Sequence, residues 1–153
     1  MSYRDAPAVR TLHDVRVNFL DSLAVLAGCG EQWGAALPDG TRPDVFRADS
    51  SRHILFLGDA KNTEGPGNLA TQARLNAYFS WLGGHVRNGG VGVFAICAGS
   101  GCDIRGWVST LSMLGHEAAM TCERWRVDRF MPDTVVLIMT FVDAAREPSP
   151  AEA

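Results

Sequence analysis

The sequence has few of the features that mark membrane, disulfide-rich or strongly basic proteins. No apolar run is long enough to cross a bilayer, and the run 135–142 has the length of a core strand. The first residues lack the pattern of a signal peptide, so we expect a cytoplasmic location. A net charge of −3 argues mildly against a protein that coats nucleic acid, although it does not exclude an enzyme with an acidic site.

Cysteine and histidine are scattered along the chain without regular spacing. The four cysteines are Cys29, Cys97, Cys102 and Cys122. They form no pair of pairs and have no nearby histidine, so structural or incidental thiols are favoured, with zinc or a disulfide as the open alternative. The four histidines, His13 among them, have no zinc-like spacing and are interpreted as incidental.

Lysine is the scarcest charged residue, because the chain has one lysine against 13 arginines. Lys61 ends the strand-like run 53–61, which closes with Gly58-Asp59-Ala60-Lys61. Side chains two apart in a strand share a face, so Asp59 and Lys61 project together. A compact ammonium at the one position that is not arginine suggests a task that a planar guanidinium does not perform.

The apolar pattern predicts one domain over residues 1–145, followed by a frayed, proline-rich tail at 146–153. The expected elements are a helix at 10–27, a hairpin with strands at 33–37 and 43–48, a strand at 53–61, a helix at 69–82, a strand at 91–98, a helix at 103–115 capped by Asp103, and strands at 121–129 and 134–142. Pro38-Asp39-Gly40-Thr41 is the expected hairpin turn, and Gly83-Gly84 is expected to end the second helix.

The first helix is predicted from apolar residues at three- and four-residue steps. They are Leu12, Val15, Phe19, Leu23 and Leu26. The whole order predicts an α/β fold in which a mixed sheet is sandwiched by helices.

This order and one motif resemble the PD-(D/E)xK nuclease superfamily, which has the restriction-endonuclease-like fold. The family core is a helix, a three-stranded meander, a helix and a further strand, and residues 10–98 resemble it. Pro43-Asp44, 15 residues before Asp59, resembles the first motif element, and Asp59-Ala60-Lys61 resembles the second. A Gln followed by a Tyr is frequent on the next helix, where Gln72 and Tyr78 are the nearest match.

The resemblance implies a Mg²⁺ site, with Mn²⁺ as a substitute, held by the Asp44 and Asp59 carboxylates and the Ala60 carbonyl. Lys61 would orient or deprotonate the attacking water, and Gln72 would lie near the site. Asp14 or Asp21 on the first helix, or Glu64 after the lysine, could add a further acid. The structural alternative is a turn residue at Asp44 and a strand-end ion pair between Asp59 and Lys61.

The expected function is therefore a small metal-dependent DNA endonuclease. The alternatives are a non-catalytic nucleic-acid- or partner-binding module with the same fold, and an α/β protein outside the family. Two arginine groups are candidate nucleic-acid contacts or plain solvated faces: Arg124, Arg126 and Arg129, and Arg42, Arg47 and Arg52.

We also expect a homodimer, because one site cuts one strand and two-fold symmetry supplies a second site. The apolar side chains offered for such a contact, or else for the core, are Trp107, Met113, Trp125 and Phe130.

Overall fold

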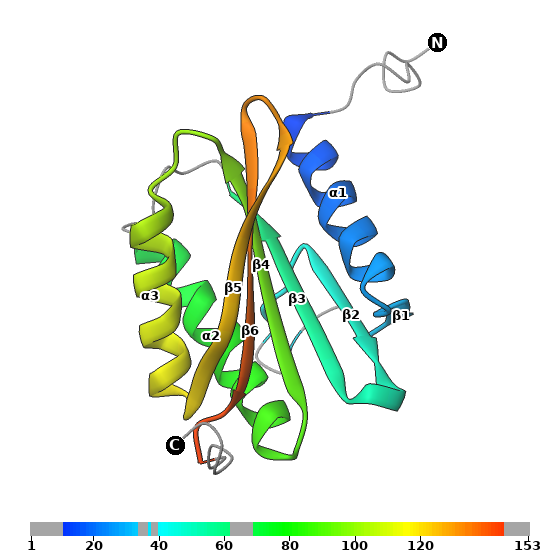
Figure 1. The fold of residues 1–153 in the computed structure, drawn as a ribbon, viewed down its shortest axis with the longest axis vertical. Coiled ribbons are helices and arrows are strands. Elements are labelled where there is room, and N and C mark those ends of the chain that lie inside the picture. Colours follow the sequence, from blue (N-terminus) through cyan, green and yellow to red (C-terminus); the bar gives the residue numbers. More distant parts are fainter. Residues whose placement is uncertain (1–10, 34–36, 38–39, 62–68, 146–153) are drawn as a thin grey trace.

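The structure of the chain, a computed structural model, describes residues 11–33, 37, 40–61 and 69–145. It is a mixed α/β fold with a six-stranded sheet and three α-helices in the described residues (Figure 1). The elements are α1 Leu12–Leu26, β1 Glu31–Gln32, β2 Val45–Asp49, the short 3-10 helix η2 Ser50–Arg52, β3 Ile54–Ala60, α2 Leu69–Arg87, β4 Val91–Gly99, α3 Ile104–Glu117, β5 Met120–Met131 and β6 Thr134–Asp143.

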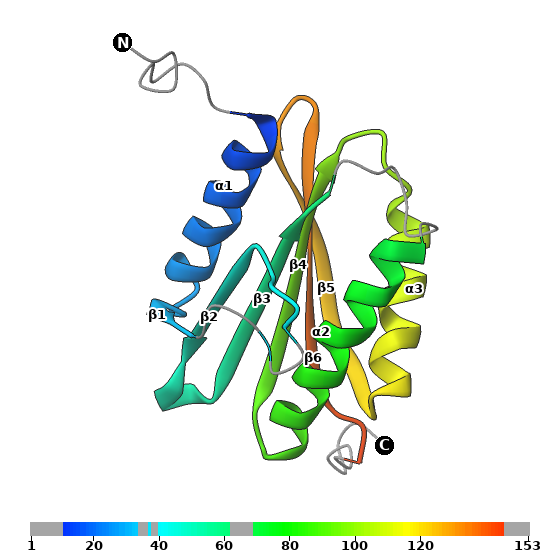
Figure 2. The same cartoon turned by 180° about the vertical axis from the view of Figure 1, so that it is seen from behind.

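The strands lie in the order β1-β2-β3-β4-β6-β5. The pair β3 and β4 is parallel and every other neighbouring pair is antiparallel. Helix α1 covers one face of the sheet, while α2 and α3 cover the other (Figures 1 and 2). The predicted order of elements is thus confirmed, and the described helices include none long and apolar enough to cross a membrane.

The central strand β3 separates two apolar cores, as its nearly continuous apolar sequence predicts. Leu55 and Leu57 point into the core under α2 and α3, whereas Phe56 and Ala60 point into the core under α1. Because side chains alternate along the strand, Asp59 belongs to the α2 face. The acid therefore lies at the end of a strand that is covered on both sides.

The buried row of α1 differs from the predicted one. Its fully buried residues are Arg16, Leu20 and Ala24, while Leu26 is 83% exposed. Phe19 and Leu23 pack only partly against the core. Because one of the three buried residues is an arginine, a search for apolar residues alone does not detect this row. The predicted row of buried residues is therefore displaced by one position.

The predicted end of α2 at Gly83-Gly84 is wrong, because the helix continues to Arg87. A Cβ atom on Gly83 would lie 2.8 Å from the carbonyl oxygen of Ala118, the residue that follows α3. Gly83 therefore permits a close approach of two backbones inside a continuing helix. The chain turns instead at Gly89, whose φ is +93°.

The first meander strand is also misplaced. The prediction put it at 33–37, but β1 is Glu31–Gln32, which pairs with Ala48 and Arg47, and β2 begins at Val45 rather than Pro43. In the expected turn, Gly40 has a φ of +88° and Leu37 and Thr41 are joined by a backbone hydrogen bond. Residues 34–36 and 38–39, and the predicted tail at 146–153, lie outside the described residues.

The remaining boundaries agree to within about two residues. The side chain of Asp103 accepts a hydrogen bond from the Gly106 amide and begins α3, as predicted. The last two strands form the expected hairpin, with Pro132 and Asp133 at its turn.

Candidate functional site

Two carboxylates from neighbouring strands converge at the C-terminal end of β3. The antiparallel register sets Val45 opposite Gly58, which brings Asp44 beside Asp59. The Asp44 amide donates to Asp59 Oδ1 at 3.3 Å, and the Ala60 amide donates to Asp44 Oδ2 at 2.9 Å. Side chains 15 residues apart in the sequence are therefore locked together through each other's backbone.

The lysine completes this cluster. Lys61 Nζ lies 2.7 Å from Asp59 Oδ2, and the side chains of Lys61 and Asp59 are only 12% and 1% exposed. The contact is an ion pair without hydrogen-bond direction, and the buried Oδ2 has no hydrogen-bond partner in the described residues. Asp59 and Lys61 thus share a strand face as predicted.

The surroundings of Asp59 disfavour its charged form. Burial, the interaction between the Asp59 and Asp44 carboxyl groups and the charge of Asp44 raise the pKa of Asp59 to about 6, against the opposing effect of Lys61. One lysine therefore does not compensate for two adjacent acids, one of which is buried. The structural alternative, a strand-end ion pair between Asp59 and Lys61, does not account for the second acid beside this pair.

A divalent cation fits this chemistry. Hard cations prefer carboxylate and carbonyl oxygens, and an incoming positive charge would offset the repulsion between Asp44 and Asp59. No group of three or more His, Cys, Asp and Glu side chains that could hold a metal ion occurs in the described part of the chain. The Ala60 carbonyl stays the predicted third protein ligand.

The three further candidate acids, Asp14, Asp21 and Glu64, are not brought together with the acid pair in one cluster of described residues. Asp21 is paired with the guanidinium of Arg47, with Arg47 Nη2 donating to Oδ2 at 3.0 Å. Asp14 is exposed and lines, with His13 and Asp44, a surface cavity of about 340 Å³. Glu64 lies outside the described residues, and Gln72 is half-buried on α2, where its role stays a prediction.

Two residues of α2, Arg74 and Tyr78, lie near the acid pair, and the sequence pattern did not indicate Arg74. The Tyr78 hydroxyl accepts from Arg74 Nη2 at 2.9 Å and donates to the Arg42 carbonyl at 3.2 Å. Burial first, and the Asp59 charge second, raise the pKa of Tyr78 to about 12. Arg74 precedes Tyr78 by four residues, so Arg74 rather than Gln72 occupies the position one helical turn before the tyrosine.

Arg16 is a second residue near the site that the sequence pattern did not indicate. Its side chain is buried and donates from Nη1 to the Lys61 carbonyl at 3.3 Å, from Nε to Thr134 Oγ1 at 3.2 Å and from Nη2 to the Asp133 carbonyl at 3.4 Å. It joins the end of β3 to the β5–β6 turn, beside which α1 begins in Figure 1. The available signal was its position four residues before Leu20, within the buried row.

His13 lies nearer the site than its interpretation as incidental implies. Its Nε2 is 3.6 Å from Asp44 Oδ1, on a side chain that is 41% exposed. His13 precedes Arg16 by three residues, which places both at the end of α1 that faces the acid pair. An imidazole at this point could accept a proton or hold a water molecule beside Asp44.

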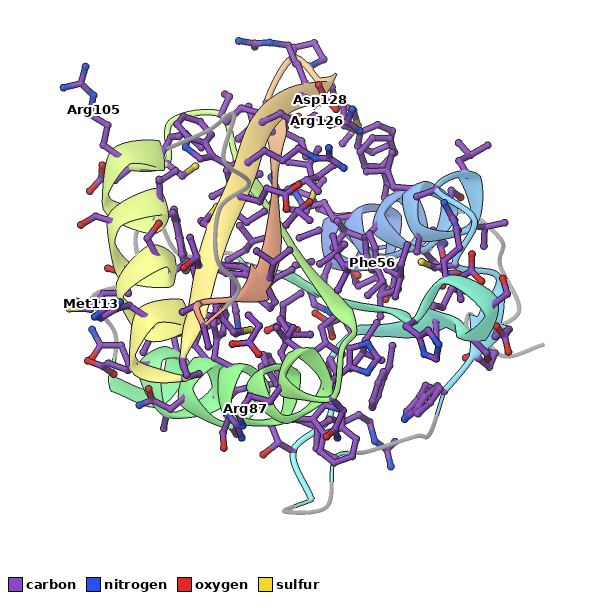
Figure 3. All side chains as sticks on the ribbon, turned by 60° about the horizontal axis from the view of Figure 1, so that its bottom comes forward. Phe56, Arg87, Arg105, Met113, Arg126 and Asp128 are labelled. Atoms are coloured by element: carbon purple, nitrogen blue, oxygen red, sulfur yellow. The ribbon has the colours of Figure 1, made fainter. Side chains whose placement is uncertain are left out.

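The other sequence features have mainly structural partners. Arg47 and Arg52 are ion-paired with Asp21 and Asp49, and the exposed Arg126 and Asp128 lie 3.3 Å apart near the tip of β5 (Figure 3). The four cysteines are free, which rules out the disulfide alternative. Burial raises the pKa of Cys97 to about 11, as expected for an inert core thiol.

Comparisons with known proteins leave the family open. No protein-family model matches the chain, and no match was found among curated proteins or solved structures.

Proposed function

We propose that this chain is a metal-dependent phosphodiester hydrolase, acting as a small DNA endonuclease with a restriction-endonuclease-like fold. The observation that carries the proposal is the buried Asp59, which is joined to Asp44 across β2 and β3 and paired with the only lysine of the chain. The order α1, β1 to β3, α2, β4 supports the family resemblance, since it contains the expected meander and the parallel fourth strand.

Asp44, Asp59 and the Ala60 carbonyl would hold Mg²⁺, or Mn²⁺ in its place. When bound, the ion supplies Lewis-acid stabilisation of negative charge on the phosphoryl oxygens and lowers the pKa of a bound water. Lys61 orients the attacking water, and its ammonium offsets charge that develops in the transition state. Arg16 fixes the peptide carbonyl of Lys61 and thereby the direction in which the lysine leaves the strand.

His13 is the candidate proton acceptor beside Asp44, because its Nε2 lies 3.6 Å from Oδ1 of that carboxylate. Half-exposed, it can exchange protons with solvent. We assign Gln72 a secondary position near the substrate, as the resemblance implies.

A homodimer remains part of the proposal, with a revised surface. Trp107 is fully buried, and the ring centroids of Phe130 and Phe19 stack 3.8 Å apart. Trp107 and Phe130 therefore pack within the fold and are not offered for a dimer contact. Trp125 is 50% exposed on the edge strand β5, and Met113 points outward from α3 (Figure 3). An edge strand with exposed apolar side chains is a site where a second copy could pair.

Metal binding is the first test of the proposal. Titration calorimetry with Mg²⁺ and Mn²⁺ should show binding to the wild type, a large loss of affinity in Asp44→Asn, and wild-type affinity in Asp128→Asn. Asp128 is the matched control because it is an exposed acid on β5, beside Arg126 (Figure 3). Equal affinities in wild type and Asp44→Asn would remove Asp44 from the ligand set.

Substrate class is tested by a cleavage screen with both metals. Supercoiled plasmid, linear duplex, branched DNA, single-stranded DNA and RNA are incubated with wild type and with Lys61→Ala. We expect cleavage of DNA by wild type alone. Binding without cleavage of any substrate would favour the non-catalytic module instead.

A further inference from the structure

The rim of the acid pair carries an arginine, Arg74, whose hydrogen bonds to described residues come from Nε and Nη2 alone. Arg74 is held through Nε and Nη2, which both donate to the Tyr78 hydroxyl, while Nη2 also donates to the Arg42 carbonyl at 3.0 Å. Nη1 makes no hydrogen bond to the residues that the structure describes. The guanidinium is therefore fixed in direction, and within the described part of the chain both N–H donors of Nη1 have no protein acceptor.

The hydrogen bond to the carbonyl of Arg42, which precedes Asp44 by two residues, places this group near the site. The bond to Tyr78 is the largest cause that raises the pKa of Arg74, and the charges of Asp59 and Asp44 add to it. Arg74 nevertheless forms no ion pair with either carboxylate. Its charge is therefore kept close to the acids without being neutralised by direct contact.

A purely structural role explains only part of this arrangement. Tyr78 already bonds the Arg42 carbonyl and could join α2 to the segment before β2 by itself. The additional hydrogen bonds from Arg74 immobilise a long side chain. This costs conformational entropy that an arginine side chain in solvent would keep. A fixed, forked cation beside two acids, one of them buried, is instead suited to holding a phosphate, because the guanidinium geometry matches phosphate oxygens.

We propose that Arg74, oriented by Tyr78, binds a non-bridging oxygen of a substrate phosphate next to the Asp44–Asp59 pair, and that the ligand of this face is the phosphodiester backbone of duplex DNA. The inference rests on the proposed function for the identity of the reaction. It adds a substrate-binding residue that acts through its Nη1 donors, with the Tyr78 hydroxyl as the positioning group. No chemical step is assigned to either residue.

The test measures DNA binding separately from cleavage. Fluorescence anisotropy of a labelled duplex is recorded with Ca²⁺ in place of Mg²⁺, over a series of salt concentrations, with a gel to verify that the probe stays intact. The variants are Arg74→Met, Arg74→Lys and Tyr78→Phe, and the control is Arg105→Met. Arg105 is an exposed arginine near the start of α3 (Figure 3), without an ion pair in the described residues.

We expect Arg74→Met to bind duplex DNA roughly ten-fold or more weakly, since a hydrogen bond to a charged group is lost. The slope of log Kobs against log salt should fall by about 1, as for the loss of one phosphate contact. Arg74→Lys should keep most of the salt slope but not the affinity. Tyr78→Phe should lower affinity with little change in slope, and Arg105→Met should resemble wild type in both.

Four outcomes decide the matter. Wild-type affinity and slope in Arg74→Met would overturn the inference, and so would weaker binding with an unchanged slope, or a wild type that binds no duplex. Weaker binding with the smaller slope, in variants that unfold at the wild-type temperature, would support it. Cleavage with Mg²⁺ is scored separately: binding that depends on Arg74 without any cleavage would leave this inference standing and defeat the hydrolase proposal.

Discussion

Replacement of Asp59 by asparagine should stabilise the metal-free protein at neutral pH. Burial and Asp44 raise the pKa of Asp59 from 3.8 to about 6, so ionisation costs more in the folded than in the unfolded chain. A folded pKa above the unfolded one gives stability that is full below about pH 4 and is lost as the pH rises through about 6. Two pKa units correspond to about 3 kcal/mol, which is the upper figure for this penalty.

Asparagine keeps the shape of the neutral acid and never ionises, so it avoids the penalty. At pH 7.5 the free energy of unfolding of Asp59→Asn should exceed that of wild type by up to about 3 kcal/mol. The midpoint of thermal unfolding should rise by roughly 5–10 °C for a chain of this size. Near pH 4 the two proteins should unfold together, because wild-type Asp59 is then protonated.

The assay is urea and thermal unfolding of both proteins in EDTA at several pH values, with Asp128→Asn as a control that should show little of this dependence. A lower stability of Asp59→Asn at pH 7.5 would refute the reasoning. It would mean that the ion pair with Lys61 outweighs burial and the repulsion from Asp44. Added Mg²⁺ should reverse the order, because only the wild type keeps both carboxylates.

Three other changes test separate parts of the account. Lys61→Arg should lose nearly all cleavage while unfolding like wild type, because the guanidinium is broader and stays protonated; full activity would exclude the water-orienting role. Arg16→Met should lower the free energy of unfolding by about 2–3 kcal/mol in a urea titration, since one buried and two partly buried acceptors lose their donor, and Arg16→Lys should recover only part of this; no loss in Arg16→Met would show that solvent replaces these hydrogen bonds. Gly83→Val should destabilise the fold by more than 1 kcal/mol, because its Cβ would meet the Ala118 carbonyl oxygen, whereas Gly84→Ala should not, because its Cβ would make only an ordinary contact with Arg87 Nη2 at 3.9 Å.

The sequence predicted the core of the fold because its strongest signals are local. The apolar runs of β3 and β4 are buried on both faces, and the Asp103 cap begins α3, as the residues indicate. The two errors in α1 and α2 have one origin. Arg16 in α1 and Gly83 in α2 make contacts with segments that are distant in the sequence. The spacing of apolar residues does not reveal such contacts.

The candidate site was predictable to the extent that it follows strand register. Asp59 and Lys61 share a face by alternation alone, and the meander brings Asp44 opposite them. Arg74, Arg16 and His13 reach the site from helices whose rotation about their axes depends on tertiary packing. Single-sequence patterns do not specify that rotation.

The central claim is tested most directly by relaxation of supercoiled plasmid, with wild type, Asp59→Asn and Asp128→Asn purified in parallel. The account predicts Mg²⁺-dependent nicking by wild type and Asp128→Asn, abolished by EDTA, and no nicking by Asp59→Asn even though this variant is folded and more stable at neutral pH. Equal nicking by all three proteins, or none by a wild type that binds Mg²⁺, would contradict it.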